Sequence, residues 1–210
     1  NCAEAAWSVD MASSPRFDEI LLEGNRINGM VVRTPALPDG ETRWERLGTG
    51  KQVVRVFLET LTIGPASQLS ILDGVVLKFG PQVSLVVEGQ LSVTGNELSP
   101  VIFTALSDDS AGGDSDESTA PPNRGTWRGL YVNPNNTGAR LALVNTEIRY
   151  AENGVFLVNM PLWIYDGLII SDSLYYGISC DALSMFTLTE EAILFFNNGS
   201  ESLSCPTPNR

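Results

Sequence analysis

Two imperfect copies of one short pattern, within residues 64–95, constrain the fold of this chain more than any other feature. The first copy runs from Gly64-Pro65 through Asp73-Gly74 to Val75, and the second runs from Gly80-Pro81 through Glu88-Gly89 to Leu91. Each copy contains a Gly-Pro turn, a short apolar strand pattern, an acidic-Gly break and a second apolar segment. A unit this short cannot bury its apolar face alone, so neighbouring copies must stack. The repeat therefore predicts a solenoid.

The alternation of side chains within these segments predicts which residues form the core. In Val75–Phe79 we expect the charged Lys78 to face solvent, which turns Val75, Leu77 and Phe79 inward. Glu88 is expected to face outward for the same reason. The same parity assigns these further side chains to the core: Leu85, Val87, Leu91 and Val93.

The rest of the chain divides around this repeat. Residues 1–24 are expected to form an N-terminal cap with a short helix, because Ser14 precedes Pro15 and apolar residues follow at helical spacing. Residues 25–205 are expected to form the solenoid, interrupted by an acidic polar loop at 107–126 that leaves the coil. Residues 206–210 are expected to be a tail or linker.

Composition excludes several functional classes. The chain has 25 acidic and 13 basic residues and a net charge of −12, which argues against binding to nucleic acid or to anionic lipid. It contains no histidine, which removes histidine-based triads and histidine zinc sites. No apolar run is long enough to predict a membrane-spanning segment. Residues 151–209 contain no Lys or Arg, so this part is either a solvated acidic flank or a face for cations or basic partners.

Three cysteines bear on the cellular location. Cys180 and Cys205 are 25 residues apart, about one coil of the expected solenoid. Strands in neighbouring coils lie about 4.8 Å apart, within the reach of a disulfide. The two residues are therefore either a disulfide or two buried thiols. Cys2 is either the lipid-anchored cysteine of a lipoprotein or an unpaired terminal residue. Together these features favour an extracellular or cell-envelope location.

Several motifs in fixed order resemble the right-handed parallel β-helix repeat proteins of bacterial secreted and surface multidomain chains. The motifs that carry the resemblance are Gly74–Pro81, Leu85–Leu91, Pro100–Thr104, Ser107–Asp114, Gly125–Leu130 and Asn145–Gly154. The resemblance covers roughly residues 63–205 and implies an all-β, right-handed parallel β-helix. It implies less about activity, because the family contains pectin-degrading enzymes, other polysaccharide lyases and non-catalytic surface proteins.

A metal site is the clearest candidate in the acidic loop. Asp108, Asp109, Asp114 and Asp116 lie within ten residues, together with Gly112-Gly113. Ca²⁺ takes six to eight oxygen ligands, and a glycine-containing loop lets several carboxylates converge on one ion. The alternative is an acidic loop that its own charge keeps solvated. We expect Ca²⁺ at these four aspartates.

The expected function is non-catalytic: a secreted or surface-displayed module that serves as a rigid spacer and recognition or adhesion surface, stiffened by Ca²⁺. The alternative is a module that binds or cleaves polysaccharide, for which a carboxylate cluster with a nearby arginine on one flank is required. Arg128, Arg140 and Arg149 are the arginines that we consider as its possible partners. Aromatic rings could line such a flank, although most aromatics in solenoids are buried. The candidates are Trp127, Tyr131, Tyr150, Trp163, Tyr165, Tyr175 and Tyr176. The expected partners are a polysaccharide or surface protein and other domains of a larger chain.

Overall fold

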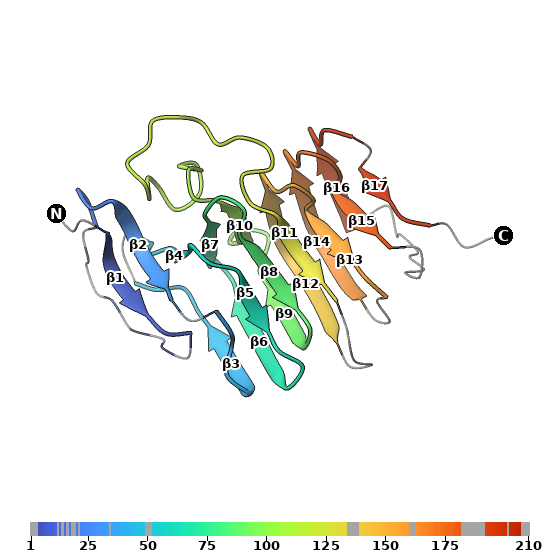
Figure 1. Cartoon of the computed structure of the whole chain (residues 1–210), viewed down its shortest axis with the longest axis horizontal. Coiled ribbons are helices and arrows are strands. Elements are labelled where there is room, and N and C mark those ends of the chain that lie inside the picture. Colours follow the sequence, from blue (N-terminus) through green and yellow to red (C-terminus); the bar gives the residue numbers. More distant parts are fainter. Residues whose placement is uncertain are drawn as a thin grey trace.

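The chain forms a parallel β-solenoid of about seven turns (Figure 1). The computed structural model describes residues 4–11, 13, 15, 17, 20, 22–33, 35–48, 52–133, 139–159, 163–181, 192–200 and 202–206. The strands are β1 (Ala5–Val9), β2 (Ile27–Val32), β3 (Gly40–Trp44), β4 (Arg55–Phe57), β5 (Leu61–Ile63), β6 (Ser67–Leu72), β7 (Val76–Phe79), β8 (Ser84–Val87), β9 (Gln90–Thr94), β10 (Val101–Ala105), β11 (Gly129–Val132), β12 (Arg140–Arg149), β13 (Val155–Leu157), β14 (Trp163–Ser171), β15 (Ile178–Cys180), β16 (Ile193–Phe196) and β17 (Leu203–Ser204).

The strands line three faces of the coil. Face A contains β1, β2, β4, β7, β10, the second halves of β12 and β14, and β16. Face B contains β3, β6, β9 and the first halves of β12 and β14. Face C is a separate sheet of β5, β8, β11, β13, β15 and β17. All the pairings between these strands are parallel, so the architecture predicted from the repeat is confirmed.

The strand registers give the length of one turn. On face C, Leu61 pairs with Leu85 and Leu130 pairs with Val155, steps of 24 and 25 residues. The step from Leu85 to Leu130 is 45 residues, because the acidic loop is inserted into that turn. The side chains predicted to face the core from β7, β8 and β9 are buried, which confirms the predicted parity.

Aromatic rings stack along the interior. Phe79 lies between Phe57, at a ring-centroid distance of 5.2 Å, and Phe103, at 6.4 Å. Trp127 stacks on Phe79 at 4.3 Å with nearly parallel planes. Parallel strands place identical positions of successive turns above one another, so the rings meet face to face and add to the apolar area that each turn buries.

The corner between faces B and A depends on small residues. Asn145 lies within β12 at a φ of +45°, and its side-chain amide donates to the carbonyl oxygen of Gly95, 3.3 Å away. A Cβ added to Gly167 in the next turn would lie 2.4 Å from Asn145 Oδ1. Glycine is therefore required where successive corners approach this closely.

The N-terminal segment covers the first turn, and the helix predicted there falls mostly on residues outside the described ones. Its described residues contain the strand β1, which pairs in parallel with β2, and no helix. Met11 and Phe17 are buried in the main core, and Trp44 donates from Nε1 to the carbonyl oxygen of Met11 at 3.3 Å. The expectation of a helical cap is therefore not met in the described residues. Extended backbone and two inserted apolar side chains cover this end.

The first half of the acidic loop lies back across the outer face of face A, whereas most residues from Glu117 to Arg124 are exposed. In Figure 1 it arches, in yellow-green, above the N-terminal strands. Leu106, just before the loop, and Ala111 within it pack in a second apolar cluster with Ile27, Val31, Val54, Val56 and Val76. The prediction that Lys78 faces solvent is wrong for this reason: it points outward, but the loop covers it completely.

The last described turns are joined covalently. Cys180 ends β15, Cys205 follows β17, and their sulfur atoms form a disulfide with the Cα atoms 4.6 Å apart. Cys2 lies outside the described residues. Among the described residues, no helix has the length and apolar character needed to cross a membrane.

Candidate functional site

The acidic loop, residues 107–126, is fixed to face A by contacts of its own backbone. The backbone N–H of Asn28 donates to the carbonyl oxygen of buried Ser115 at 2.9 Å. Gly112 has a φ of +70°, and a Cβ added there would lie 2.2 Å from Val54 Cγ1. The loop thus approaches the sheet at a residue whose backbone angle and lack of a side chain both favour glycine.

A buried lysine lies beneath the loop. Lys78 Nζ donates to the carbonyl oxygen of Gly113 at 2.6 Å. Burial lowers the pKa of Lys78 from its ordinary value, and the negative charges of four loop carboxylates oppose that shift. The four carboxylates are those of Asp108, Asp109, Asp116 and Asp114. Lys78 therefore supplies one positive charge to the underside of the acidic loop.

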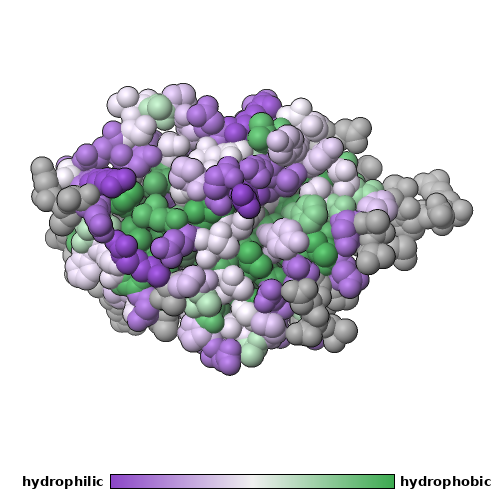
Figure 2. Space-filling view, in the orientation of Figure 1, coloured by the Kyte–Doolittle hydropathy of each residue, from purple (hydrophilic) through white to green (hydrophobic). Residues whose placement is uncertain are grey.

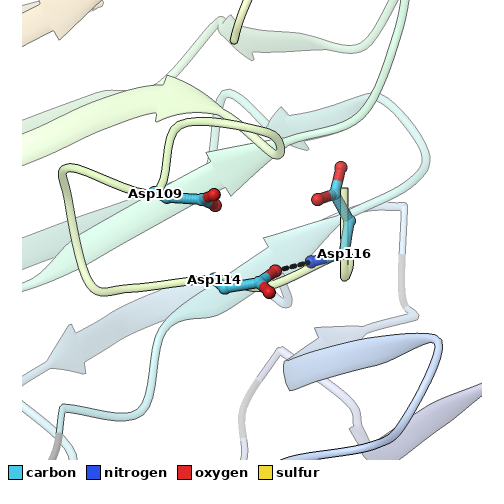
Figure 3. A group of neighbouring side chains, drawn as sticks. All are labelled: Asp109, Asp114 and Asp116. Atoms are coloured by element: carbon cyan, nitrogen blue, oxygen red, sulfur yellow. Dashed lines mark hydrogen bonds between the residues drawn. The ribbon is translucent and has the colours of Figure 1, made fainter. Parts of the chain in front are cut away.

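Three of the four predicted metal ligands come together above this lysine. One carboxylate oxygen from each of Asp109, Asp114 and Asp116 lies within 4.8 Å of the other two. Figure 3 shows Asp109 on the outgoing segment of the loop, with Asp114 and Asp116 on the segment that returns. Asp109 and Asp114 are exposed and Asp116 is half-buried, so the group is open to solvent.

Hydrogen bonds within the loop hold two of these carboxylates in place. Asp114 Oδ1 accepts from the backbone N–H groups of Asp116, at 3.2 Å, and Glu117, at 2.7 Å. Asp116 Oδ1 accepts from the backbone N–H of Ser118 at 3.0 Å. Such turns explain why aspartate rather than glutamate occupies these positions, since the shorter side chain reaches its own backbone.

The fourth predicted ligand, Asp108, has different partners. Its buried carboxylate accepts from Thr104 Oγ1 at 2.6 Å and from Ser110 Oγ at 2.6 Å. Arg149 Nη1 lies 3.5 Å from Asp108 Oδ2 and also pairs through Nε and Nη2 with Glu147. Asp108 thus connects the beginning of the loop to face A, and it is not one of the three clustered carboxylates.

The surroundings of Asp109 disfavour its ionised form when no cation is present. The pKa of Asp109 is raised, first by partial burial and then by the negative charge of Asp114. Lys78 opposes this shift. Like charges held this close favour either protonation or binding of a cation. Carboxylate and carbonyl oxygens are the ligands that Ca²⁺ and Mg²⁺ prefer, so the donor set fits a hard divalent cation.

A second candidate site is a groove of about 450 Å³ on the outer side of face C. Tyr131 of β11 and Phe156 of β13 are register partners in successive turns, and their rings stack at 5.2 Å with an interplanar angle of 9°. Val86 of β8 lines the same groove. The rings form a flat apolar platform of the kind that accepts the apolar face of a ligand.

A polar wall borders this platform. Gln82 Oε1 accepts from Arg128 Nε at 3.3 Å and from Arg128 Nη2 at 3.2 Å. Gln82 Nε2 donates to Glu152 Oε1 at 3.2 Å. The φ of Gln82 is +62°, a conformation uncommon for a residue with a side chain. Figure 2 shows hydrophobic and hydrophilic surface interspersed across the solenoid in the view of Figure 1.

The sequence indicates some residues of these sites and not others. It proposed Tyr131 among several aromatic candidates, but it also proposed Trp127, whose ring is buried in the core. It missed Phe156, Gln82 and Lys78. The one available signal for Phe156 was its 25-residue spacing from Tyr131, about one turn, whereas no local signal identifies Lys78 as a partner of a loop 30 residues downstream.

No family model, curated protein or solved structure matched this chain.

Proposed function

We propose that this chain is a non-catalytic β-solenoid module, secreted or displayed on a cell surface, that acts as a rigid spacer and a recognition or adhesion surface. The observation that supports the spacer role most directly is the stacking of parallel strands and interior rings through about seven turns. The Cys180–Cys205 disulfide supports an oxidising, extracellular or cell-envelope location.

Binding of Ca²⁺ at Asp109, Asp114 and Asp116 stiffens the module in this proposal. An ion there would neutralise carboxylates that repel one another. It would also hold together the outgoing and returning segments of the acidic loop. The loop in turn covers the outer apolar cluster of face A. Lys78 contributes one positive charge to the same loop, so the ion and the lysine act together on its aspartates.

Single-molecule force spectroscopy tests the spacer role. The chain is pulled from its two ends in Ca²⁺ and again in EDTA. A rigid module unfolds in one or a few high-force steps, and the force is higher in Ca²⁺. Gradual extension at low force in both conditions would refute the spacer role.

A second candidate function, binding or cleavage of polysaccharide, is favoured by the groove on face C. Stacked Tyr131 and Phe156 offer a platform for sugar rings, and Arg128 offers a cation for a uronate carboxylate. A lyase would also need a general base beside the sugar, and Glu152 is the nearest carboxylate to Arg128 in this groove, through Gln82.

A glycan-array screen with Ca²⁺ and EDTA arms tests this candidate. Binding to uronate or neutral glycans that is lost in Tyr131→Ala and Phe156→Ala would establish carbohydrate recognition in the groove. Any glycan bound would then be assayed for an unsaturated product by its ultraviolet absorbance. No binding in either arm leaves the spacer and protein-recognition role as the function.

A further inference from the structure

The acidic loop contacts turns near both ends of face A, although it begins and ends in the middle of the solenoid. It leaves the coil after β10 and rejoins it before β11. In a solenoid each turn packs on its two neighbours, so a change in one end turn weakens with every further turn of the stack. A segment that contacts both ends offers a second, direct connection between them.

Residues 112–115 are the N-terminal anchor of the loop. The backbone N–H of Asn28, in β2, donates to the carbonyl oxygen of Ser115 at 2.9 Å. A Cβ added to Gly112 would lie 2.2 Å from Cγ1 of Val54, which directly precedes β4. The loop is therefore held to two neighbouring turns at the N-terminal end of face A.

Arg124 and Gly125 are the C-terminal anchor of the loop. Arg124 Nη2 donates to Oδ1 of Asn197, which directly follows β16. A Cβ added to Gly125 would lie 2.8 Å from Cδ2 of Leu174, so the loop backbone packs on a side chain that follows β14. From β2 to β16 face A crosses six strand spacings, roughly 29 Å at about 4.8 Å each. The two anchors thus lie on turns that do not touch each other.

The connecting segment, residues 116–123, is stiffened by local contacts. The backbone N–H of Ser118 donates to Asp116 Oδ1 at 3.0 Å, and that of Ala120 donates to Ser118 Oγ at 3.2 Å. Pro121-Pro122 follows, and the proline rings fix two further φ angles. A displacement at one anchor is therefore passed along this segment, because few of its backbone angles are free to absorb it.

We propose that the acidic loop is a strap that couples the first turns of face A to the last one, so that loosening at one end reaches the other without passing through the coil. The inference deepens the rigid-spacer role proposed above, and the use of the strap to the protein rests on that role. The coupling is a property of the two anchors and the segment between them, and it must act in both directions.

Hydrogen–deuterium exchange of the full chain in EDTA, read by mass spectrometry, tests the strap. Gly112→Ala disturbs the N-terminal anchor, and peptides from β16 report on the other end, with β8 as the reference. Short exchange times are used, at which end strands exchange by local opening. Val32→Ala is the matched control, because Val32 lies in β2 but faces the main core, so its truncation loosens the same turn and leaves the loop contacts in place.

We expect Gly112→Ala to accelerate exchange in β16 at least about threefold, the effect of losing one hydrogen bond there. Val32→Ala should accelerate exchange in β2 and leave β16 unchanged. Pro121→Gly/Pro122→Gly loosens the connecting segment without touching either anchor, and in that background Gly112→Ala should no longer affect β16. Arg124→Ala, at an exposed side chain, should accelerate exchange in β2, and it keeps the test decisive if Gly112→Ala does not fold.

Three results would overturn the proposal. The first is exchange in β16 that Gly112→Ala leaves unchanged, together with exchange in β2 that Arg124→Ala leaves unchanged. The second is equal acceleration of β16 by Val32→Ala, which would show that the coil itself carries the effect. The third is acceleration that persists with the two glycines in the connecting segment. Each of these results leaves the spacer role to the force measurement, which tests it independently.

Discussion

Lys78 Nζ donates a hydrogen bond to the carbonyl oxygen of Gly113 at a distance of 2.6 Å, and this contact joins face A to the loop that covers it. The lysine is fully buried, and its neighbours in β7 are also buried. Its side chain faces away from the solenoid interior, as alternation requires, but the loop replaces solvent on that side. The acidic loop is therefore part of the folded body.

Substitution of two adjacent glycines tests whether the loop packs on face A. Both Gly112 and Gly113 have positive φ, so alanine strains the backbone at either position by about 1 kcal/mol. Only Gly112 approaches the sheet, where a Cβ would lie 2.2 Å from Val54 Cγ1, whereas nothing lies within 4 Å at Gly113. Gly112→Ala should reduce the free energy of unfolding in urea by about 2–3 kcal/mol, and Gly113→Ala by about 1 kcal/mol. Equal losses would contradict the packing.

The raised pKa of Asp109 predicts a pH-dependent effect of Asp109→Asn in EDTA. A carboxyl whose folded pKa is raised stabilises the fold below its unfolded value of 3.8, and this contribution is lost as pH rises through the folded pKa. Asp109→Asn should therefore be more stable than the unmodified chain at pH 7, and the two should converge near pH 3. Urea midpoints at several pH values measure this. Glu117→Gln, in the same loop but outside the three-carboxylate group, is the control for removing one charge from the loop.

Removal of the buried guanidinium of Arg55 is expected to increase the free energy of unfolding. Arg55 Nη1 donates to the carbonyl oxygen of Glu45 at 3.1 Å, its charge lies 5.2 Å from the Trp44 ring, and Nε and Nη2 have no hydrogen-bond partner. Burial lowers the pKa of Arg55 to about 10. Arg55→Met removes this desolvated charge and should increase the free energy of unfolding at pH 7 by about 1 kcal/mol.

The same group gives the pH dependence of that gain. Because the folded pKa is below the unfolded value, the folded chain binds fewer protons, and its stability rises as pH increases above about 10. The advantage of Arg55→Met should therefore shrink between pH 9 and pH 11. An advantage that stays constant over this range, or a loss of stability at pH 7, would show that Arg55 has partners that compensate its charge.

Removal of the disulfide is expected to reduce the free energy of unfolding substantially. Cys180 and Cys205 are 25 residues apart in the sequence, and the bond between them restricts the unfolded chain over that length. Cys180→Ser/Cys205→Ser should therefore lose about 3 kcal/mol in free energy of unfolding. Mass spectrometry after alkylation without reductant checks the bond itself. Alkylation of both residues in the native protein would show that they are thiols.

Local patterns in the sequence predict which side chains of the coil face its core. They do not predict which outward-facing side chains the loop covers. Leu85, Val87, Leu91 and Val93 are buried as alternation predicts, because each lies on a strand whose inner side is fixed by its neighbours in the stack. Lys78 follows the same alternation and is nonetheless buried. Its cover comes from a distant insertion, and a two-residue period contains no information about that.

The candidate metal site shows the same division. The glycines and aspartates of the loop indicate a turn-rich segment able to gather oxygen ligands. They do not indicate that Asp108 turns toward Thr104 and Arg149 while its neighbour Asp109 faces Asp114. That difference depends on where Arg149 lies, which is set by the register of β12 with β10.

Thermal unfolding in Ca²⁺ and in EDTA tests the central claim, that the clustered carboxylates of the acidic loop bind a cation that stiffens the solenoid. The unmodified chain should melt at a lower temperature in EDTA than in Ca²⁺, because binding to the folded state alone adds stability. Asp114→Asn/Asp116→Asn should remove the difference. An unmodified chain that melts at the same temperature in both solutions would contradict the claim.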